Sequence, residues 1–374
     1  MNSSSAQSHE DDEQLQYGSK FKTHKHYILL LAINYLFLFV GSVSSSLLCK
    51  YYFVHKGSSL WVSTWVQSAG FPVLALPIYL PYFLKCTNRR PFSRFTPNFL
   101  ALSLFVGIML GLNNFLFSLG SFYLPLSTSS LLLSSQLAFT LLLSALIVKQ
   151  KITFSNLNCV ILLTSSAILL GLITSNDRPA GLTHAKYLKG LFSTVGAGLL
   201  FALYLPVMEK VYRTVYCYAM VVEMQLVMQV AATVFASVGM AVDGGFHEMV
   251  EESRRVFDKG ETVYWVVLVS NVITWQMCFL GTAGMVFLTT GITGGICMTA
   301  LTGMNVVAGV VAFKDQFGGV KAMATVLCGW GFCSYVYGMY VKMKEERVKE
   351  NMKMMISEHS VPAMEMSRVA VDGP

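Results

Sequence analysis

About ten long apolar blocks make up most of this sequence. Each holds roughly 18 to 25 residues, which is the length that a helix needs to cross about 30 Å of hydrocarbon. The apolar residues form continuous blocks rather than the spaced stripe of an amphipathic helix, so lipid is the expected solvent. The sequence therefore predicts an all-α polytopic membrane protein with about ten transmembrane helices. The blocks span residues 27–49, 60–84, 98–117, 122–148, 156–174, 188–208, 215–241, 262–285, 288–313 and 320–341.

The composition agrees with a chain embedded in lipid. Of the 374 residues, 54% are hydrophobic and 13% are charged, whereas an average soluble domain has roughly 25% charged residues. The net charge of +7 comes from basic residues between the apolar blocks, as is typical of loops beside anionic headgroups, so no nucleic acid is expected as a partner. The eight cysteines lie mostly inside apolar blocks and show no metal-ligand spacing.

Basic residues in the short connections predict the orientation, because cytoplasmic loops carry an excess of Lys and Arg. With the N-terminus in the cytoplasm, that side holds more basic residues than the other side, whose loop 243–261 is of mixed charge. Both termini are therefore expected in the cytoplasm. The basic residues assigned to this side are Lys20, Lys22, Lys25, Lys85, Arg89, Arg90, Arg94, Lys149, Lys151, Lys210, Arg213, Lys342, Lys344, Arg347 and Lys349.

A weak internal repeat relates the two halves of the chain. Residues 126–155 align with residues 289–318, and this alignment places Ser127 on Thr290. Each half then holds five helices, and an odd number makes the second copy enter the membrane upside down. Inverted repeats of this kind are common in secondary transporters.

The repeat and the polar segments predict the domain boundaries. We expect a first five-helix repeat at 27–174, a connecting loop at 175–187 and a second five-helix repeat at 188–341. The segments 1–26 and 342–374 are polar, and we expect them to be cytoplasmic tails that are disordered or lie at the membrane surface.

Several catalytic patterns are missing from the sequence. It has no Gly-x-x-x-x-Gly-Lys-Ser/Thr loop for ATP, no His-Glu-x-x-His zinc pattern and no Gly-x-Ser-x-Gly nucleophile pattern. We therefore expect neither an enzyme nor a cofactor. Transport by such a chain would be driven by a gradient.

Glu223 is a carboxylate inside an apolar block, near the middle of 215–241. A charge in hydrocarbon is costly unless it faces the bundle interior or a wet cavity. Two interpretations remain open. Glu223 is either permanently protonated or paired with a neighbouring amide, or it couples transport to protons or binds the solute, since burial favours the neutral form of a carboxylate.

Amides and tryptophans inside the blocks are candidates for binding a planar solute. An amide donates and accepts hydrogen bonds, which suits the mixed edge of a heterocyclic base, and an aromatic ring can stack on it. For any single amide, hydrogen bonding between helices is the alternative. The intramembrane amides are Asn34, Gln67, Asn113, Asn114, Gln136, Gln225, Gln229, Asn271, Gln276 and Asn305. The predicted binding set is Trp65, Gln67, Asn114, Gln136, Trp275 and Asn305.

Several stretches of the chain resemble the plant purine permeases, a family of the drug/metabolite transporter superfamily. The longest reads Tyr-Leu-Pro-Leu-Ser-Thr-Ser-Ser-Leu-Leu from Tyr123 and continues to Thr140. The matches run in order from about residue 27 to about residue 340. The others are residues 67–72, 175–179, 222–225, 275–276 and 330–338.

This resemblance implies the fold of two inverted five-helix repeats and a place in the plasma membrane. It also implies proton-coupled uptake of adenine and related bases, of cytokinins, or in some members of alkaloids and vitamin B6 forms. The partners would be a small heterocyclic solute, protons and the lipid bilayer. Two alternatives stay open: a carrier of alkaloids or other heterocyclic metabolites in the plasma or vacuolar membrane, and a membrane receptor or scaffold that transports nothing.

The chain departs from the family pattern at two positions. Where many members carry Leu-Leu-Pro-x-x-Glu, residues 300–305 read Ala-Leu-Thr-Gly-Met-Asn, so Asn305 replaces the usual glutamate. Met339 replaces a second common glutamate. An amide cannot take up a proton near neutral pH. The histidines lie towards the predicted membrane surfaces, and Asp177, Glu209 and Asp315 fall in or beside loops. By elimination, we expect Glu223 to be the proton-coupling group.

Overall fold

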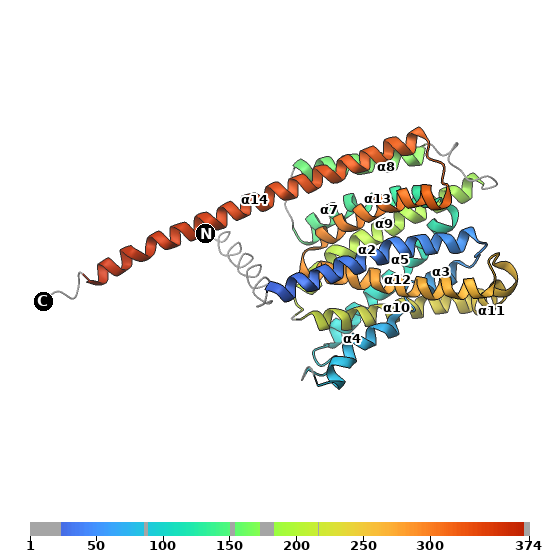
Figure 1. The fold of residues 1–374 in the computed structure, drawn as a ribbon, viewed down its shortest axis with the longest axis horizontal. Helices are drawn as coiled ribbons and strands as arrows, with labels where there is room; N and C mark the ends of the chain where they lie inside the picture. Colours follow the sequence, from blue (N-terminus) through green and yellow to red (C-terminus); the bar gives the residue numbers. More distant parts are fainter. Residues whose placement is uncertain (1–23, 86–88, 150–153, 173–182, 216, 370–374) are drawn as a thin grey trace.

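The computed structural model describes residues 24–85, 89–149, 154–172, 183–215 and 217–369, and these form helices and short connections without any strand. The long helices pack side by side with their axes roughly aligned (Figure 1). The family-like stretch 175–179, most of the predicted connecting loop and the N-terminal segment as far as residue 23 lie outside the described residues. So do Lys20, Lys22 and Lys151 of the orientation argument.

The first half of the chain contains two interrupted helices. Gly70 precedes α4, and Pro72 lies in the first turn of α4, where a proline can stand at no cost. At the second interruption, the Ser134 and Ser135 hydroxyls donate to the Leu131 and Leu132 carbonyls at 2.6 Å and so compete with the helix ladder. The helices are α2 (His24–Val54), α3 (Leu60–Val66), α4 (Phe71–Phe83), α5 (Pro97–Tyr123), α6 (Leu126–Leu133), α7 (Gln136–Ile147) and α8 (Phe154–Leu172).

The second half contains the longer uninterrupted helices. Gly244, in the left-handed conformation with φ of 74°, separates α10 from α11, a position that favours glycine. The elements are α9 (His184–Tyr212), α10 (Tyr218–Asp243), α11 (Gly245–Glu251), the π-helical turn η1 (Glu252–Val256), α12 (Glu261–Leu288), α13 (Gly291–Phe313) and α14 (Gly319–Val369).

Among the described residues, seven helical segments are long and apolar enough to cross a membrane. This confirms the prediction of a polytopic α-helical membrane protein. The count of ten spans goes beyond this finding. The seven segments are α2, α5, α6 with α7, α9, α10, α12 and α13.

The structure adds detail to three sequence expectations. The blocks 60–84 and 122–148 are each interrupted, because mean hydropathy does not register a break. The mixed-charge loop 243–261 contains α11 and η1. The segment after 341 continues as part of α14 as far as Val369, since its Lys, Glu and Met residues are strong helix formers.

Each end of the bundle gathers a different set of connections. Helix α2 begins and α14 ends at the same end (Figure 1), which we call the terminal face; α11 lies at the opposite end, the distal face.

Helices α2 and α12 approach so closely that a Cβ at Gly41 or Gly281 would overlap the backbone of the facing helix. Large apolar side chains such as Phe105 and Val307 are exposed on the outside, as lipid contact requires.

Candidate functional site

The bundle interior holds amide atoms that make no hydrogen bond. Each such atom costs about 1–3 kcal/mol if nothing polar meets it. Native proteins tolerate few of them, so this many indicates a place for water or a polar solute. Within the described residues, the buried unpaired amide atoms are Gln67 Oε1, Asn113 Oδ1, Asn114 Nδ2, Gln136 Nε2, both amide atoms of Gln225 and of Gln229, Asn271 Oδ1, Gln276 Oε1 and Asn305 Oδ1.

The interruption between α3 and α4 orients Gln67 toward α5. Its Nε2 donates to the Asn114 carbonyl at 3.2 Å and to Ser118 Oγ at 2.8 Å. It also donates to the Ser63 carbonyl at 3.0 Å. Gln67 and Asn114 are both fully buried. Two of the predicted residues are thus in direct contact, and each keeps a polar atom without a partner.

Trp275 joins the same region from α12. Its ring stacks on Phe279 with centroids 5.4 Å apart and meets the edge of Phe117 at 5.3 Å. Phe117 follows Asn114 by one turn of α5, so Trp275 lies near the Gln67 contact. The indole Nε1 is buried and makes no hydrogen bond. We call Gln67, Asn114 and Trp275 the central cluster.

Gln136 and Asn305 lie on two other helices that pack together, α7 and α13. Gln136 is the first residue of α7, directly after the serine interruption, and its Nε2 is unpaired. Asn305 donates from Nδ2 to Ser46 Oγ of α2 at 3.1 Å and keeps Oδ1 unpaired. Both are buried in the bundle, on helices other than those of the central cluster.

Trp65 is placed differently from the rest of the predicted set. Its Nε1 donates to Ser237 Oγ of α10 at 3.2 Å. The ring packs with a group of apolar residues that includes Tyr52, Met240 and Phe257, toward the distal face. The indole N–H is therefore already used within the protein.

Glu223 forms an ion pair that the sequence did not suggest. Its Oε2 lies 2.8 Å from a terminal guanidinium nitrogen of Arg89, and the carboxylate side chain is 3% exposed. Another Arg89 nitrogen donates to Cys217 Sγ at 2.8 Å. Arg89, assigned to a cytoplasmic loop, is thus the partner, rather than a neighbouring amide. A buried carboxylate needs a cation, and this requirement could have pointed to the basic pair at Arg89 and Arg90.

The position of Glu223 also differs from the expectation. It lies in the second turn of α10, near the terminal face, because the helix begins at Tyr218. Two other carboxylates, Glu209 and Glu252, are buried as well. The elimination that singled out Glu223 is therefore weaker than the sequence suggested.

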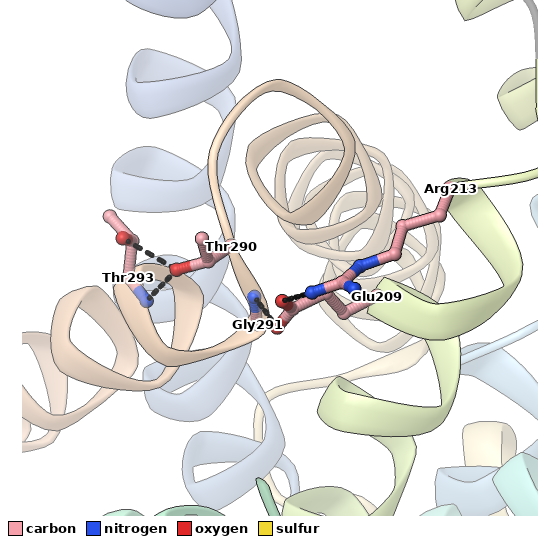
Figure 2. A network of polar contacts seen from close by, with 5 residues as sticks. All are labelled: Glu209, Arg213, Thr290, Gly291 and Thr293. Atoms are coloured by element: carbon pink, nitrogen blue, oxygen red, sulfur yellow. Dashed lines mark hydrogen bonds and ion pairs between the residues drawn. The ribbon is translucent and has the colours of Figure 1, made fainter. Parts of the chain in front are cut away.

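Glu209 belongs to a polar group at the terminal face (Figure 2). It lies in the last turn of α9, where the sequence placed it beside a loop, and Oε2 accepts from the Gly291 N–H at 2.8 Å. Arg213 approaches the other oxygen at 3.4 Å. Thr290 caps the same end of α13 by accepting from the Thr293 N–H at 3.2 Å. A carboxylate at a helix N-terminus is electrostatically favourable.

Glu252 is held at the distal face by hydroxyl groups. Its Oε2 accepts from the Tyr52 hydroxyl at 2.7 Å and from the Tyr264 hydroxyl at 3.0 Å. Its Oε1 accepts from the N–H and the hydroxyl of Ser58. These bonds attach η1 to the end of α2.

A second carboxylate at the distal face caps α6. Asp315, in the connection from α13 to α14, accepts from the N–H and the hydroxyl of Ser127, both at 2.8 Å. Buried Lys321 also donates to the Ser127 hydroxyl, at 3.3 Å. Lys50 donates to the Leu124 carbonyl at 2.6 Å. We call the Ser127–Asp315 contact the distal latch. This contact was not predicted from the sequence.

Comparison with known proteins identifies the family. A family model described as purine nucleobase transmembrane transport matches residues 29–345. The chain belongs to the purine permease family. "Probable purine permease 4" of Arabidopsis thaliana is 67% identical over 296 residues, covering 79% of this chain and 78% of that protein. "Purine permease 3" of the same plant is 34% identical and covers 85% of this chain and 93% of its own length.

The structural comparison agrees with a shared fold. A solved crystal structure with 14% sequence identity superposes on the purine permease chain with a TM-score of 0.53. The match covers 82% of this chain and 98% of the other. The family model and the purine permease relatives, and not this superposition, confirm the resemblance drawn from the sequence motifs.

Proposed function

We propose that this purine permease is a secondary active transporter that couples the uptake of purine bases and purine-like solutes, such as adenine and cytokinins, to protons. The observation that carries the proposal is the set of buried, unpaired amide atoms inside a membrane bundle of this family. Such atoms need a polar, planar partner or water, and a purine base offers donors and acceptors along its edges. Catalysis on the solute is not part of the proposal.

The solute site we propose lies between the two halves and uses the predicted binding set. The central cluster would hold one side of the base through Gln67 and Asn114, with Trp275 stacking on the ring. Gln136 and Asn305 would face it from α7 and α13. Trp65 would contribute only its ring, because its N–H is already bonded to Ser237.

The architecture we propose has ten spans in two inverted five-helix repeats, 27–174 and 188–341. In this arrangement α3 with α4, and α6 with α7, are interrupted spans, while α8 and α14 are the fifth and tenth. The contacts between helices support this architecture. When each helix is replaced by its equivalent in the other half, the same contacts result. Helix α2 packs on α12 as α9 packs on α5, and α8 packs on α14. Unwound interruptions near the centre are typical of transporter binding sites.

The proton coupling that we propose uses competition between a proton and Arg89 for the Glu223 carboxylate. The guanidinium at 2.8 Å favours the ionised carboxylate, so this conformation corresponds to the state without the proton. Loading the proton requires Arg89 to withdraw, which would move the connection between α4 and α5. If the terminal face is cytoplasmic, return of Arg89 releases the proton into the cytoplasm.

Uptake of labelled adenine into cells that express the chain, with and without a protonophore, tests this proposal. We expect accumulation that the protonophore abolishes. Adenine uptake that is insensitive to the protonophore would contradict coupling. Absence of adenine uptake, with uptake of a labelled alkaloid, would favour the carrier alternative, and absence of any flux would favour a receptor or scaffold.

A further inference from the structure

Two glutamines on α10 stand outside the predicted binding set. Gln225 and Gln229 are one helical turn apart and therefore share a face of the helix. Both are fully buried, and all four of their amide atoms lack a hydrogen-bond partner. Among the described residues, only these two have both amide atoms buried and unpaired.

An amide kept for packing would look different. Asn34 of α2 is equally buried, but its Nδ2 donates to the Leu30 carbonyl at 2.8 Å and its Oδ1 accepts from the Tyr218 hydroxyl at 2.9 Å. In a dry interior, a leucine at position 225 or 229 would be more favourable than an unpaired amide. The two buried glutamine amides are therefore explained only if a polar molecule contacts them during the transport cycle.

The helix geometry shows where the pair points. Val222 packs with Leu74 and Ile78 of α4, while the backbone at Met228 lies against Gly107 of α5. At about 100° per residue, positions 225 and 229 fall on the arc between these two contacts. Helix α10 also packs on α3 and α12. The two glutamines thus face the region between α4 and α5.

Helices that pack on α10 also carry unpaired polar atoms. Gln276 of α12 donates to the Ser68 carbonyl at 3.4 Å, which ties α12 to the interruption between α3 and α4. The Ser68 hydroxyl and Gln276 Oε1 are themselves unpaired. Neighbours of α10 therefore hold further buried donors and acceptors without partners.

We propose that Gln225 and Gln229 recognise the exocyclic group of the purine base and so determine substrate specificity, an inference that rests on the proposed function. The oxygen of a glutamine amide can accept a hydrogen bond from the exocyclic N6 amino group of adenine. The amide can also turn over and donate to the O6 of an oxopurine. Such a pair accepts both amino- and oxopurines and disfavours a base with no exocyclic group.

The test compares three bases in liposomes that contain the purified full-length protein. Initial rates of labelled adenine uptake are measured for the wild type, Gln225→Leu and Gln229→Leu, with unlabelled adenine, hypoxanthine or unsubstituted purine as competitor. We expect each variant to raise the inhibition constants of adenine and hypoxanthine about tenfold, the effect of one lost hydrogen bond, and to leave that of unsubstituted purine nearly unchanged.

Thermal unfolding separates recognition from a structural role. Removal of an unpaired buried amide leaves the melting temperature of both leucine variants unchanged or higher. The matched control Asn34→Leu removes an amide with internal partners, so its melting temperature falls while the ratio of inhibition constants stays as in the wild type. An unchanged adenine-to-purine ratio in both glutamine variants overturns the inference. A wild-type protein with no adenine flux overturns the proposed function, and this inference with it.

Discussion

At the residue scale, a buried charge depends on its counter-ion for stabilisation. Glu223 and Arg89 are far apart in the sequence, and hydropathy alone places one in a helix and the other in a loop. The sequence could predict that Glu223 and the amides are buried, because they stand inside apolar blocks. It could not predict which partner each one meets, since partners come from distant segments.

Glu223→Gln tests the role of the carboxylate. The amide mimics the protonated form in shape and charge, so the variant should still bind adenine and exchange it across the membrane. Net accumulation and its dependence on external pH should be lost, since no proton can be released. Counterflow and net uptake in the same liposomes measure the two properties. If the variant accumulates adenine with the wild-type pH profile, the proton travels through another group.

Arg89→Gln leaves the Glu223 carboxylate buried without its cation. Breaking a fully buried pair costs about 3–5 kcal/mol. The Arg89 side chain is 23% exposed, so we expect a loss of about 2 kcal/mol, seen as a lower melting temperature in detergent. The double variant Arg89→Gln with Glu223→Gln should recover most of it. A double variant that is no more stable than Arg89→Gln alone would show that the pair is not the cause.

At the scale of elements, mean hydropathy does not reveal where a helix ends or is interrupted. The blocks at 60–84 and 122–148 were predicted as single helices, and the structure interrupts both. Pro72 and the serine pair at 134 and 135 were visible in the sequence as signals for these interruptions. The cap of α6 was not visible, because Asp315 comes from the other half of the chain.

Asp315→Ala tests the distal latch. It removes the acceptor of the Ser127 N–H and hydroxyl, and a lost cap of this kind costs about 1–2 kcal/mol. We expect a lower melting temperature of the detergent-solubilised protein. Asp258→Ala is the matched control at the same face, because Asp258 pairs with His55 near the surface and such pairs contribute about 0–1 kcal/mol. Equal melting temperatures for the two variants would contradict a stabilising latch.

On the scale of the whole molecule, the two halves show related details. The aligned residues Ser127 and Thr290 both stand at the start of a helix, and a carboxylate contacts each of these starts. The accepting carboxylates differ: Asp315 of the second half contacts the first half, while Glu209 contacts a helix of its own half. Apolar length could predict a polytopic helical protein, but not these contacts, which require distant segments of the chain to be placed in space.

The positions of the chain ends make a topological prediction. Helix α2 begins and α14 ends at the terminal face (Figure 1), and the basic connections favour the cytoplasm for that face. Tags fused to the two termini should both be protected from protease in intact cells and cleaved after permeabilisation. Tags on opposite sides of the membrane would rule out ten spans.

The central claim, that adenine and protons cross together, is tested most directly by recording the internal pH of liposomes that contain the purified protein. With equal pH on both sides and the membrane potential clamped at zero, adenine is added outside. We predict internal acidification that begins with adenine entry, and we predict none with Glu223→Gln. Entry of labelled adenine into wild-type liposomes at constant internal pH would contradict the account.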